Sequence, residues 1–468
     1  MIAVFVLAGL AAFSVLLGLH YYLWRRLIRD TTGPGSKARK AGTAAIVLAL
    51  LLMLGALVSG RAGAPFWLEQ ILAWPGYLWM ALFIYLGLST LAGEAVRPLL
   101  LRRLRRRDAA RTTAEPAPAP AAEADPSAVR ETVGAGVEGA ARQQEPASAR
   151  EPSQHPSQEP SQEPSSGALS VAADRIEEGS APGREGTVQR TPSELSRRLF
   201  VSRIIGGAAA ATALGTVGYG TYSVLRGPKL KHVTVPLAKL PRGAHGFRIA
   251  VVSDIHLGPT LGRAHTQRIV DTINSTQADL VAVVGDLVDG NVADLGPAAE
   301  PLAQLRSRHG SYFVTGNHEY FSGAQQWVNH VRELGLHPLE NARVEIDGFD
   351  LAGVNDVAGE GEGQGPDFTA ALGDRDRTRA SVLLAHQPVV IHDAVEHGVD
   401  LQLSGHTHGG QMWPGNVLAD LANPTLAGLE RYGDTQLYVT RGAGAWGPPV
   451  RVGAPSDITV VTLASKQT

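Results

Sequence analysis

The sequence has no cysteine among its 468 residues. Disulfide bonds and metal sites with sulfur ligands are therefore excluded, and cysteine usage gives no indication of the redox compartment. The formal net charge at pH 7 is only -2, which does not indicate a nucleic-acid-binding protein. Aromatic residues make up 6 % of the chain, but 44 % of the residues are hydrophobic, which is enough for one large core and additional apolar segments.

Three uncharged apolar stretches occupy the beginning of the chain, at residues 1–24, 41–58 and 71–92. Each is close to the roughly 17 to 25 residues that a helix needs to cross a bilayer. We interpret residues 1–111 as a region of three transmembrane helices. A cleaved signal peptide is the alternative for the first stretch, and it fits poorly because no basic residue precedes the apolar run.

Basic residues follow the first and third of these stretches, whereas the loop between the second and third contains only Arg61. Because basic loops stay in the cytoplasm, this distribution predicts an N-terminus and a 59–70 loop on the outside. The ring side chains of Phe66, Trp67 and Trp74 then fall at a membrane interface. The basic residues are Arg25, Arg26, Arg29, Lys37, Arg39 and Lys40 after the first stretch, and Arg97, Arg102, Arg103, Arg105, Arg106, Arg107 and Arg111 after the third.

Residues 112–195 are rich in Ala, Pro, Glu, Ser and Gln and contain a short Ser-Gln-x-Pro repeat at 153–164. Such a composition cannot bury enough apolar surface to offset the entropy of ordering the chain. We expect a disordered cytoplasmic linker. A plain spacer is the favoured interpretation of the repeat, and a partner-binding segment is the alternative.

Residues 196–226 contain a pair of arginines followed by a fourth apolar segment. The sequence Ser-Arg-Arg-Leu-Phe-Val at 196–201, with Arg197 and Arg198, resembles a twin-arginine export signal, which would make the export machinery a partner. Ordinary positive flanking of a fourth transmembrane helix is the alternative. Both interpretations place the chain after residue 225 outside a multi-pass cell-membrane anchor, although Arg226, Lys229 and Lys231 favour the opposite side.

The C-terminal half alternates predicted strands and helices. Short branched-apolar runs at 248–253, 280–284, 312–315, 382–385 and 401–404 are typical of buried strands, and helical spacing appears at 265–275, 298–308 and 325–334. A polar block follows each of the five runs. Carboxyl ends of such strands meet on one rim, so the blocks predict a site there. They are Asp254-Ile255-His256, Gly285-Asp286, Gly316-Asn317-His318-Glu319, His386 and Gly405-His406-Thr407-His408-Gly409-Gly410.

The five blocks resemble, in order, the DxH, GDxxD, GNHE, H and GHxH motifs of the calcineurin-like metallophosphoesterase superfamily, and the last block is most similar to its bacterial membrane-anchored branch. The resemblance covers about residues 246–463. It implies an α/β domain at 227–468, an αββα sandwich of two mixed sheets, preceded by the α-helical transmembrane region. Strands at 436–440 and 458–463 would complete the second sheet, and residues 359–377 form a surface loop.

The resemblance also implies a binuclear metal centre and a role for each site residue. Asp286 would bridge two divalent ions, and a metal-bridging hydroxide would attack phosphorus in line. His318 would serve the leaving oxygen, oriented by Asp289, although loop capping is an alternative for Asp289. Oxygen and nitrogen ligands suit manganese, iron or zinc. The remaining ligands would be Asp254, His256 and His408 for one ion and Asn317, His386 and His406 for the other.

One departure from the Ser/Thr protein phosphatases concerns the phosphate clamp. Those enzymes carry an arginine after the second aspartate of the GDxxD block, whereas Gly290 and Asn291 follow Asp289 here, so a protein phosphatase is not expected. Arg441 and Arg451 are candidates for the missing cation, because guanidinium groups match phosphate geometry. A structural salt bridge is the alternative for each.

Together these features predict a membrane-anchored, metal-dependent hydrolase of phosphate esters. Because the tether raises the effective concentration of membrane-bound neighbours, a lipid-linked phosphomonoester or diphosphate is the leading substrate class. A phosphodiesterase or nuclease with the same centre is the nearer alternative. An inactive metal-binding membrane sensor is the other, and the complete set of site residues argues against it.

Overall fold

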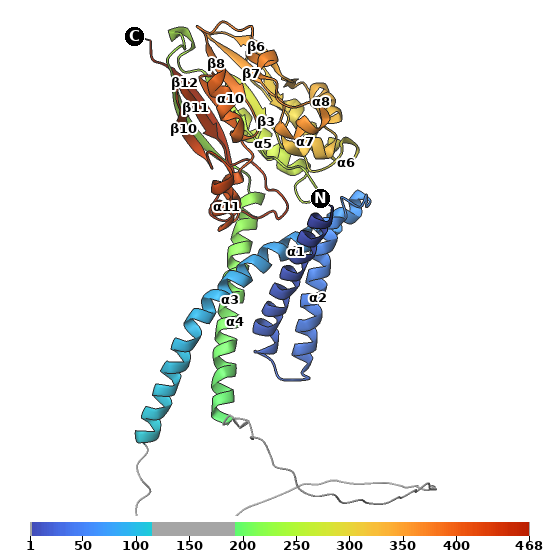
Figure 1. Ribbon diagram of the computed structural model, residues 1–468, viewed down its shortest axis with the longest axis vertical. Coiled ribbons are helices and arrows are strands. Elements are labelled where there is room, and N and C mark those ends of the chain that lie inside the picture. The colour runs from blue at the N-terminus through green and yellow to red at the C-terminus, as the bar shows by residue number, and fades with distance from the viewer. Residues whose placement is uncertain (1, 115–191, 468) are drawn as a thin grey trace, which may run out of the picture. The chain divides into compact units, whose positions relative to one another are not determined.

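The computed structural model describes residues 2–114 and 192–467. The predicted linker at 112–195 therefore lies outside the described residues except at its two ends, which are helical. Met1–Arg106 and Pro192–Thr468 belong to one compact unit. It contains a helical region and a two-sheet domain (Figure 1).

Four described helices are long and apolar enough to cross a membrane. They are α1 (Ile2–Leu23), which continues as a short π-helix, η1 (Trp24–Arg29), α2 (Lys37–Val58), α3 (Phe66–Ala114) and α4 (Pro192–Leu225). Helices α2, α3 and α4 begin before the first residue of the corresponding segment predicted from the sequence. At α2 the reason is visible, because the Ser36 side chain caps the helix by accepting a hydrogen bond from the Arg39 N–H.

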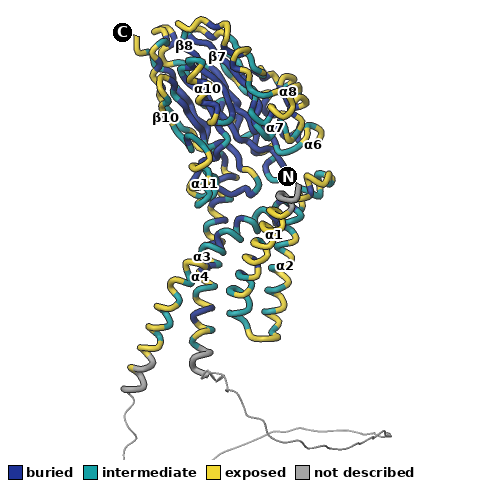
Figure 2. Tube along the Cα trace, in the orientation of Figure 1, coloured by how far each residue is buried: buried dark blue, intermediate teal, exposed yellow. Residues whose placement is uncertain are grey.

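The start of α1 and the turn between α2 and α3 lie at the end of the helices that faces the domain, whereas the α1–α2 loop lies at the other end (Figure 1). Exposed residues run along α1 and α2 (Figure 2). They include large apolar side chains such as Leu10, Leu48 and Leu51. Apolar surface of this extent on isolated helices is suited to lipid rather than water.

The domain is built on two six-stranded sheets. The first has the order β1-β12-β2-β3-β4-β5, in which β1 and β12 are parallel, β12 and β2 are antiparallel, and β2 to β5 are parallel. Its strands are β1 (Lys229–Leu237), β12 (Asp457–Ser465), β2 (Arg248–Val252), β3 (Leu280–Val284), β4 (Ser311–Val314) and β5 (His337–Pro338).

The second sheet has the order β10-β11-β9-β8-β7-β6, with antiparallel pairs at both edges and parallel strands between them. Its central strands β7, β8, β9 and β11 are therefore buried on both faces and rich in branched apolar residues. The strands are β10 (Gly428–Tyr432), β11 (Thr435–Val439), β9 (Leu401–Ser404), β8 (Ala380–Leu384), β7 (Phe349–Gly353) and β6 (Ala342–Ile346).

Strand alternation explains the layers. In β2, Ile249 and Val251 point into the core between the two sheets, whereas Ala250 and Val252 belong to the cluster under the helices that cover the first sheet. Those helices are α5 (Arg263–Ser275), α6 (Val292–Ala299), η3 (Glu300–Gln304), α7 (Asn317–Ser322) and α8 (Ala324–Glu333). The outer face of the second sheet is covered by α9 (Phe368–Leu372) and α10 (Ile391–Glu396), which confirms the αββα sandwich.

The five strands predicted before the polar blocks, β2, β3, β4, β8 and β9, are confirmed within two residues, and so are the helices predicted at 265–275 and 325–334. The helix predicted at 298–308 is wrong. The segment instead contains the end of α6 followed by the 3-10 turn η3, because Pro301 has no N–H to continue an α-helical ladder. Residues 359–377 are not a plain loop, since they include most of the 3-10 turn η4 (Val357–Glu362) and all of α9.

The placement of the last strand is also corrected. β12 was expected in the second sheet but lies in the first, between β1 and β2. Its partner β1 was not predicted, although Val233, Val235 and Leu237 alternate toward the core. A strand that pairs with a segment more than two hundred residues away leaves no local signal of its sheet.

Two main-chain carbonyls accept hydrogen bonds between the helical region and the domain. Tyr85 of α3 donates its hydroxyl to the Trp413 carbonyl at 2.8 Å, and the Arg451 N–H donates to the Gly220 carbonyl of α4 at 3.3 Å. Val450 packs into the same apolar cluster as Tyr85. The short helix α11 (Gly415–Ala422) follows this contact.

Candidate metal centre

The site is assembled where strands of both sheets end. Asp254 and His256 follow β2, Asp286 follows β3, and Asn317 opens α7 after β4. The second sheet supplies His386 after β8, and His406 and His408 after β9. Because these strands are parallel within each sheet, their carboxyl ends share one rim.

The backbone at this rim is strained. Asp254, His256, Asp286, His406 and His408 all have positive φ, between 50° and 72°. A non-glycine residue in this region costs about 1–2 kcal/mol and persists only where the surrounding structure fixes it. Five such residues at strand ends that bear carboxylates and imidazoles indicate that the backbone is shaped to aim these side chains at one point.

The main chain at Gly316 passes very close to the Asp286 side chain, which explains this glycine. Gly316 has an ordinary negative φ, but a Cβ built on it would collide with the carboxylate of Asp286. Only glycine lets the main chain before Asn317 pass this carboxylate. The GN pair of the GNHE block is therefore required by packing as well as by the Asn317 side chain.

The first group of converging side chains is Asp254, His256 and His408. Nε2 of His256 lies 2.9 Å from Nε2 of His408, and the latter lies 3.3 Å from Oδ1 of Asp254. All three residues are buried. The second group is Asp286, His386 and His406, in which Oδ2 of Asp286 lies 3.1 Å from Nε2 of His386.

Asn317 and Asp286 connect the two groups. Oδ1 of Asn317 lies 3.1 Å from Nδ1 of His406, and so joins the second group. Oδ2 of Asp286 is 3.8 Å from Nε2 of His256 in the first group. Asp286 thus lies between the groups, at the position that a bridging carboxylate would take.

The donor atoms fit divalent cations. Nδ1 of His386 lies 2.9 Å from the Val284 carbonyl and donates to it, which leaves a lone pair on Nε2. That Nε2 is buried without a hydrogen-bond partner and faces a carboxylate oxygen. In the first group, Nε2 of His256 and Nε2 of His408 are buried and lie 2.9 Å apart. A cation between them would accept a lone pair from each nitrogen. An oxygen and nitrogen donor set of this kind suits manganese, iron or zinc.

Asp289 and His318 lie beside the first group. Oδ1 of Asp289 is 2.7 Å from Nδ1 of His318 and 2.8 Å from Nδ1 of His256. One carboxylate oxygen therefore fixes two imidazole rings, one in the buried group and one at the edge of the cavity. His318 also contacts the exposed rings of Phe321 and Trp446, both at 5.7 Å between ring centres.

The electrostatics of these groups follow from burial and close opposite charges. Burial works against the ionised carboxyl of Asp289, but the rings of His256 and His318 outweigh it and lower its pKa to about 2. Burial likewise works against the charged ring of His256, and the carboxylates of Asp289, Asp286 and Asp254 raise its pKa to about 9. Positive charge is thus favoured beside the carboxylate of Asp289, whereas burial and neighbouring cationic groups lower the pKa of His406 and His408.

Glu319 is a site residue to which the sequence analysis gave no role. Its buried carboxylate accepts hydrogen bonds from the N–H groups of Asp286, Leu287 and Gly316, at 3.0, 2.8 and 2.6 Å. Burial and the neighbouring Asp286 raise its pKa to about 7. Glu319 holds together the loops that follow β3 and β4. The sequence signal for this role is a glutamate at the third position of α7, where it caps the start of the helix.

The structure contradicts the predicted substrate role of Arg451. Arg451 is 2 % exposed, and its guanidinium donates to the carbonyls of Gly444, His408 and Ala454 at 2.6, 3.1 and 3.1 Å. Its Nη2 also lies 3.1 Å from Nδ1 of His408, so it supports this ring and cannot reach a substrate.

Arg441 lies with Nη1 3.9 Å from the buried carboxylate of Asp457 and does not line the cavity at the site. This ion pair fits the salt-bridge alternative for Arg441.

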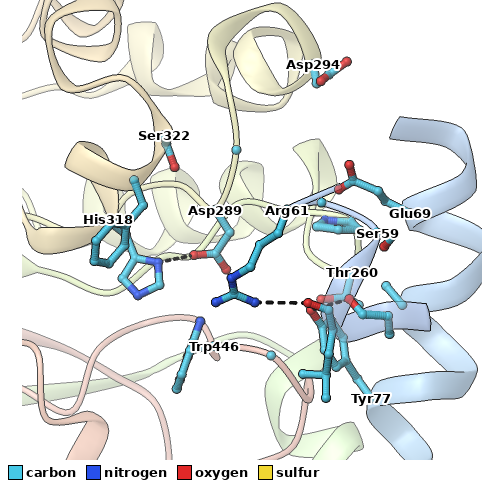
Figure 3. A pocket seen from close by; sticks show the side chains of 18 of the residues that line it. Ser59, Arg61, Glu69, Tyr77, Thr260, Asp289, Asp294, His318, Ser322 and Trp446 are labelled. Carbon is cyan, nitrogen blue, oxygen red and sulfur yellow. Dashed lines mark hydrogen bonds and ion pairs between the residues drawn. The ribbon is translucent and has the colours of Figure 1, made fainter. Parts of the chain in front are cut away.

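The centre opens into a cavity of about 870 Å³. One wall carries site residues, including Asp286, Asp289, Asn317 and His318. The opposite wall comes from the helical region, and Figure 3 shows Arg61, Glu69 and Tyr77 on that side of the cavity. The full helical contribution is Ala56, Leu57, Ser59, Gly60, Arg61, Phe66, Glu69, Ala73 and Tyr77. Sequence reasoning used Arg61 only for orientation and did not foresee this wall.

Comparison with known proteins agrees with this geometry. A family model described as calcineurin-like phosphoesterase matches residues 247–410. A transmembrane protein with metallophosphoesterase domain from Danio rerio is 40 % identical over 259 residues, which cover 52 % of this chain and 59 % of that protein. The match thus spans less than two thirds of that relative's length.

A metallophosphoesterase from Helicobacter pylori, itself uncharacterized, is 39 % identical over 259 residues, covering 54 % of this chain and 69 % of that protein. Among solved structures, a dimetal phosphatase from Danio rerio has a TM-score of 0.30 and 12 % identity, covering 47 % of this chain and 93 % of that one. The extent of identity with the bacterial relative, together with the family match, shows that this chain belongs to the calcineurin-like metallophosphoesterases, a family of metal-dependent phosphoester hydrolases.

Proposed function

We propose that this protein is a multi-pass membrane phosphoesterase that uses two divalent ions to hydrolyse a lipid-linked phosphomonoester or diphosphate on the extracytoplasmic side. The observation that carries the proposal is the shared cavity, in which the converging metal-binding groups face the ends of two apolar helices. A phosphate bound there is held between the catalytic domain and the membrane anchor.

In this proposal the two groups of side chains hold one ion each, and Asp286 lies between them. Asp254, His256 and His408 form one set, and Asn317, His386 and His406 form the other. When bound, the ions neutralise charge on the phosphoryl oxygens and activate the attacking water. The positive φ values of five of these residues support preorganisation, because the ligands are aimed before any ion binds.

His318 is the group proposed to act on the leaving oxygen. Its ring lies at the cavity, and Asp289 accepts from Nδ1 at 2.7 Å, which leaves Nε2 to face the substrate. A ring positioned in this way can donate a proton to the oxygen that departs from phosphorus. Asp289 acts as a positioning residue because it fixes the tautomer and direction of that ring.

The membrane orientation is supported by the separation of charge along the helices. The start of α1 and the α2–α3 turn lie at one end, and the α1–α2 loop, flanked by basic residues of η1 and α2, lies at the other (Figure 1). Residues of the α2–α3 turn line the cavity, which is therefore at the first end. If the basic loop is cytoplasmic, the domain is outside.

The exposed face of α11 supports contact with the bilayer surface. Val417, Leu418 and Leu421 are exposed, on a helix that begins directly after the contact between Trp413 and Tyr85 of α3. Large apolar side chains beside a transmembrane anchor are suited to the headgroup region.

The proposal is tested with the full-length protein in detergent micelles or lipid nanodiscs. Chelated protein is resupplied with manganese, zinc or iron and assayed with an aryl phosphate, an aryl phosphodiester and a vesicle-borne prenyl phosphate. We expect metal-dependent release of phosphate, and faster turnover of the prenyl ester at equal concentration. Equal or preferential cleavage of the diester would favour the phosphodiesterase alternative, and inert protein with every ion would contradict hydrolysis itself.

A further inference from the structure

We propose that the α2–α3 turn is a substrate-binding element and that Arg61 binds the second phosphate of a lipid diphosphate whose terminal phosphate lies at the metal centre. This inference rests on the proposed function and narrows its substrate class. The α2–α3 turn is defined as residues 59–65, with the ends of α2 and α3 that flank it.

The position of Arg61 is the first support. Its side chain enters the cavity from the membrane-helix side and points toward Asp289 and His318 (Figure 3). Among the described residues that line the cavity, Arg61 is the one arginine or lysine. A cation from a remote part of the chain thus lines the cavity that also contains Asp289 and His318.

The bonding state of Arg61 is the second support. Within the described residues its one hydrogen bond runs from Nη1 to the Leu57 carbonyl at 3.0 Å. Glu69, Asp289 and Asp294 line the same cavity, yet none of them forms an ion pair with Arg61 in the described structure. A guanidinium has five N–H donors, so most of them remain for an anion.

The turn is held in a fixed geometry. The N–H groups of Ala62 and Ala64 donate to the carbonyls of Val58 and Ser59, at 2.9 and 3.0 Å. Below the turn, α2 and α3 are in close contact, since a Cβ built on Gly76 would lie 2.5 Å from the Leu52 carbonyl oxygen. Arg61 therefore projects from a braced support, which lowers the entropy cost of binding a ligand.

The lining beyond Arg61 favours an amphiphile. Ala56, Leu57, Phe66, Ala73 and Tyr77 supply an apolar surface from α2 and α3, opposite the polar site residues. A pocket with polar groups at one end and apolar walls at the other fits a charged headgroup with an apolar chain. Inorganic diphosphate has the same two linked phosphate groups but gains nothing from this surface.

The reaction assigned to this arrangement is hydrolysis of the terminal phosphoryl group. A water oxygen bonds to the terminal phosphorus as the bond from that phosphorus to the bridging oxygen breaks. The lipid monophosphate leaves with the electron pair and takes a proton from His318. Orthophosphate keeps the water oxygen and one water proton, and the other water proton is released to solvent, from which His318 is protonated again. Arg61 stabilises the negative charge on the leaving phosphate.

The test compares Arg61→Ala and Arg61→Lys with a matched control, Arg226→Ala, in the metal-loaded full-length protein. Arg226 lies directly after α4, is exposed and does not line the cavity, so the control removes one positive charge without touching the site. The probes are a prenyl diphosphate, inorganic diphosphate and an aryl phosphate. A methylene-bridged prenyl diphosphonate, which cannot be cleaved, reports binding by calorimetry.

We expect Arg61→Ala to raise KM for the prenyl diphosphate, and Kd for the diphosphonate, by about 10- to 100-fold, the usual effect of losing a charged hydrogen bond. Arg61→Lys should recover part of this loss, and the Arg226→Ala protein should match the wild type on every probe. In Arg61→Ala the loss should be larger for the prenyl diphosphate than for the aryl phosphate, which has no second phosphate. The wild-type protein should bind the prenyl compound more tightly than inorganic diphosphate.

Three results would overturn the inference. An equal loss on aryl phosphate and prenyl diphosphate would make Arg61 a general structural residue, and unchanged diphosphonate binding would remove it from the site. Equal affinity for inorganic and prenyl diphosphate would assign the cavity to a soluble ligand. Failure of the wild-type protein to hydrolyse any phosphate ester while it still binds the diphosphonate would contradict the proposed function and leave the role of Arg61 standing.

Discussion

A glycine in α4 gives a prediction about how the membrane helices support the metal centre. Gly220 is buried against the segment that contains Arg451, and its carbonyl accepts the Arg451 N–H. A Cβ built on Gly220 would lie 2.6 Å from Cγ1 of Val450 and 3.0 Å from the Arg451 carbonyl oxygen. Because carbon atoms in contact are separated by about 3.5–4.0 Å, Gly220→Ala displaces this segment by roughly 1 Å.

That displacement is large relative to the bonds it affects. Arg451 holds His408 through the His408 carbonyl and Nδ1, both at 3.1 Å. A roughly 1 Å shift takes such contacts past hydrogen-bonding distance. Groups that orient metal-ligating histidines contribute about 10- to 100-fold in metal affinity when they are removed, and this is the loss that we expect for the ion held by Asp254, His256 and His408.

The assay is a metal titration of the purified full-length protein, followed by calorimetry, with hydrolysis as a second readout. Gly218→Ala is the matched control, since it lies two residues away on α4 and a Cβ there meets nothing within 4 Å. Alanine in place of this glycine should leave metal binding unchanged and stabilise the helix by about 0.5–1 kcal/mol. Arg451→Lys, which removes the guanidinium fork, should reproduce the loss. Wild-type affinity in Gly220→Ala with a clear loss in Arg451→Lys would refute transmission from α4.

Three further predictions concern the chemistry, the pH dependence and the route to the membrane. Asp286→Asn should lose both bound metal and turnover. His318→Ala should retain two ions and lower kcat by about 10²- to 10⁴-fold. Depletion of metal in His318→Ala, measured by elemental analysis, would make His318 a ligand. The pKa of Asp289 is lowered from 3.8 to about 2, so its contribution of about 2 kcal/mol to the metal-free protein is present above pH 3.8 and lost as the pH falls through about 2. Denaturant titrations across this range should show a flatter profile for Asp289→Asn, and parallel profiles would contradict the assignment. Changing Arg197 and Arg198 to lysine keeps the positive charge, and protease added to spheroplasts reports the side of the domain. Digestion of the wild-type domain with protection of the variant would indicate twin-arginine export. Equal digestion of both would indicate ordinary insertion.

The strands that carry the site could be predicted from the sequence because each is a short buried run followed by a chemically distinctive residue. β3 is the clearest case, since a continuous run of branched apolar residues ends directly before Gly285 and Asp286. This local pattern is sufficient when the ends of parallel strands converge. It could not assign β12 to a sheet, because strand order depends on a distant partner.

The side-chain roles that were missed depend on direction rather than on residue type. Arg451 has the chemistry of a phosphate ligand, but the fold turns it inward to support His408. Arg61 was a topological marker in the sequence, and only the packing of α2 and α3 against the domain brings it to the cavity. Neither outcome leaves a local pattern, since each is decided by contacts between segments far apart in the chain.

The binuclear mechanism can be tested by measuring metal stoichiometry together with hydrolysis. Full-length protein is stripped with a chelator, titrated with manganese, and assayed at each step for bound ion and for cleavage of an aryl phosphate. The account predicts two ions bound per chain, with turnover appearing only as the second ion binds, because Asp286 lies between two groups of ligands. Full turnover with a single bound ion, or two bound ions with no hydrolysis of any phosphate ester, would contradict it.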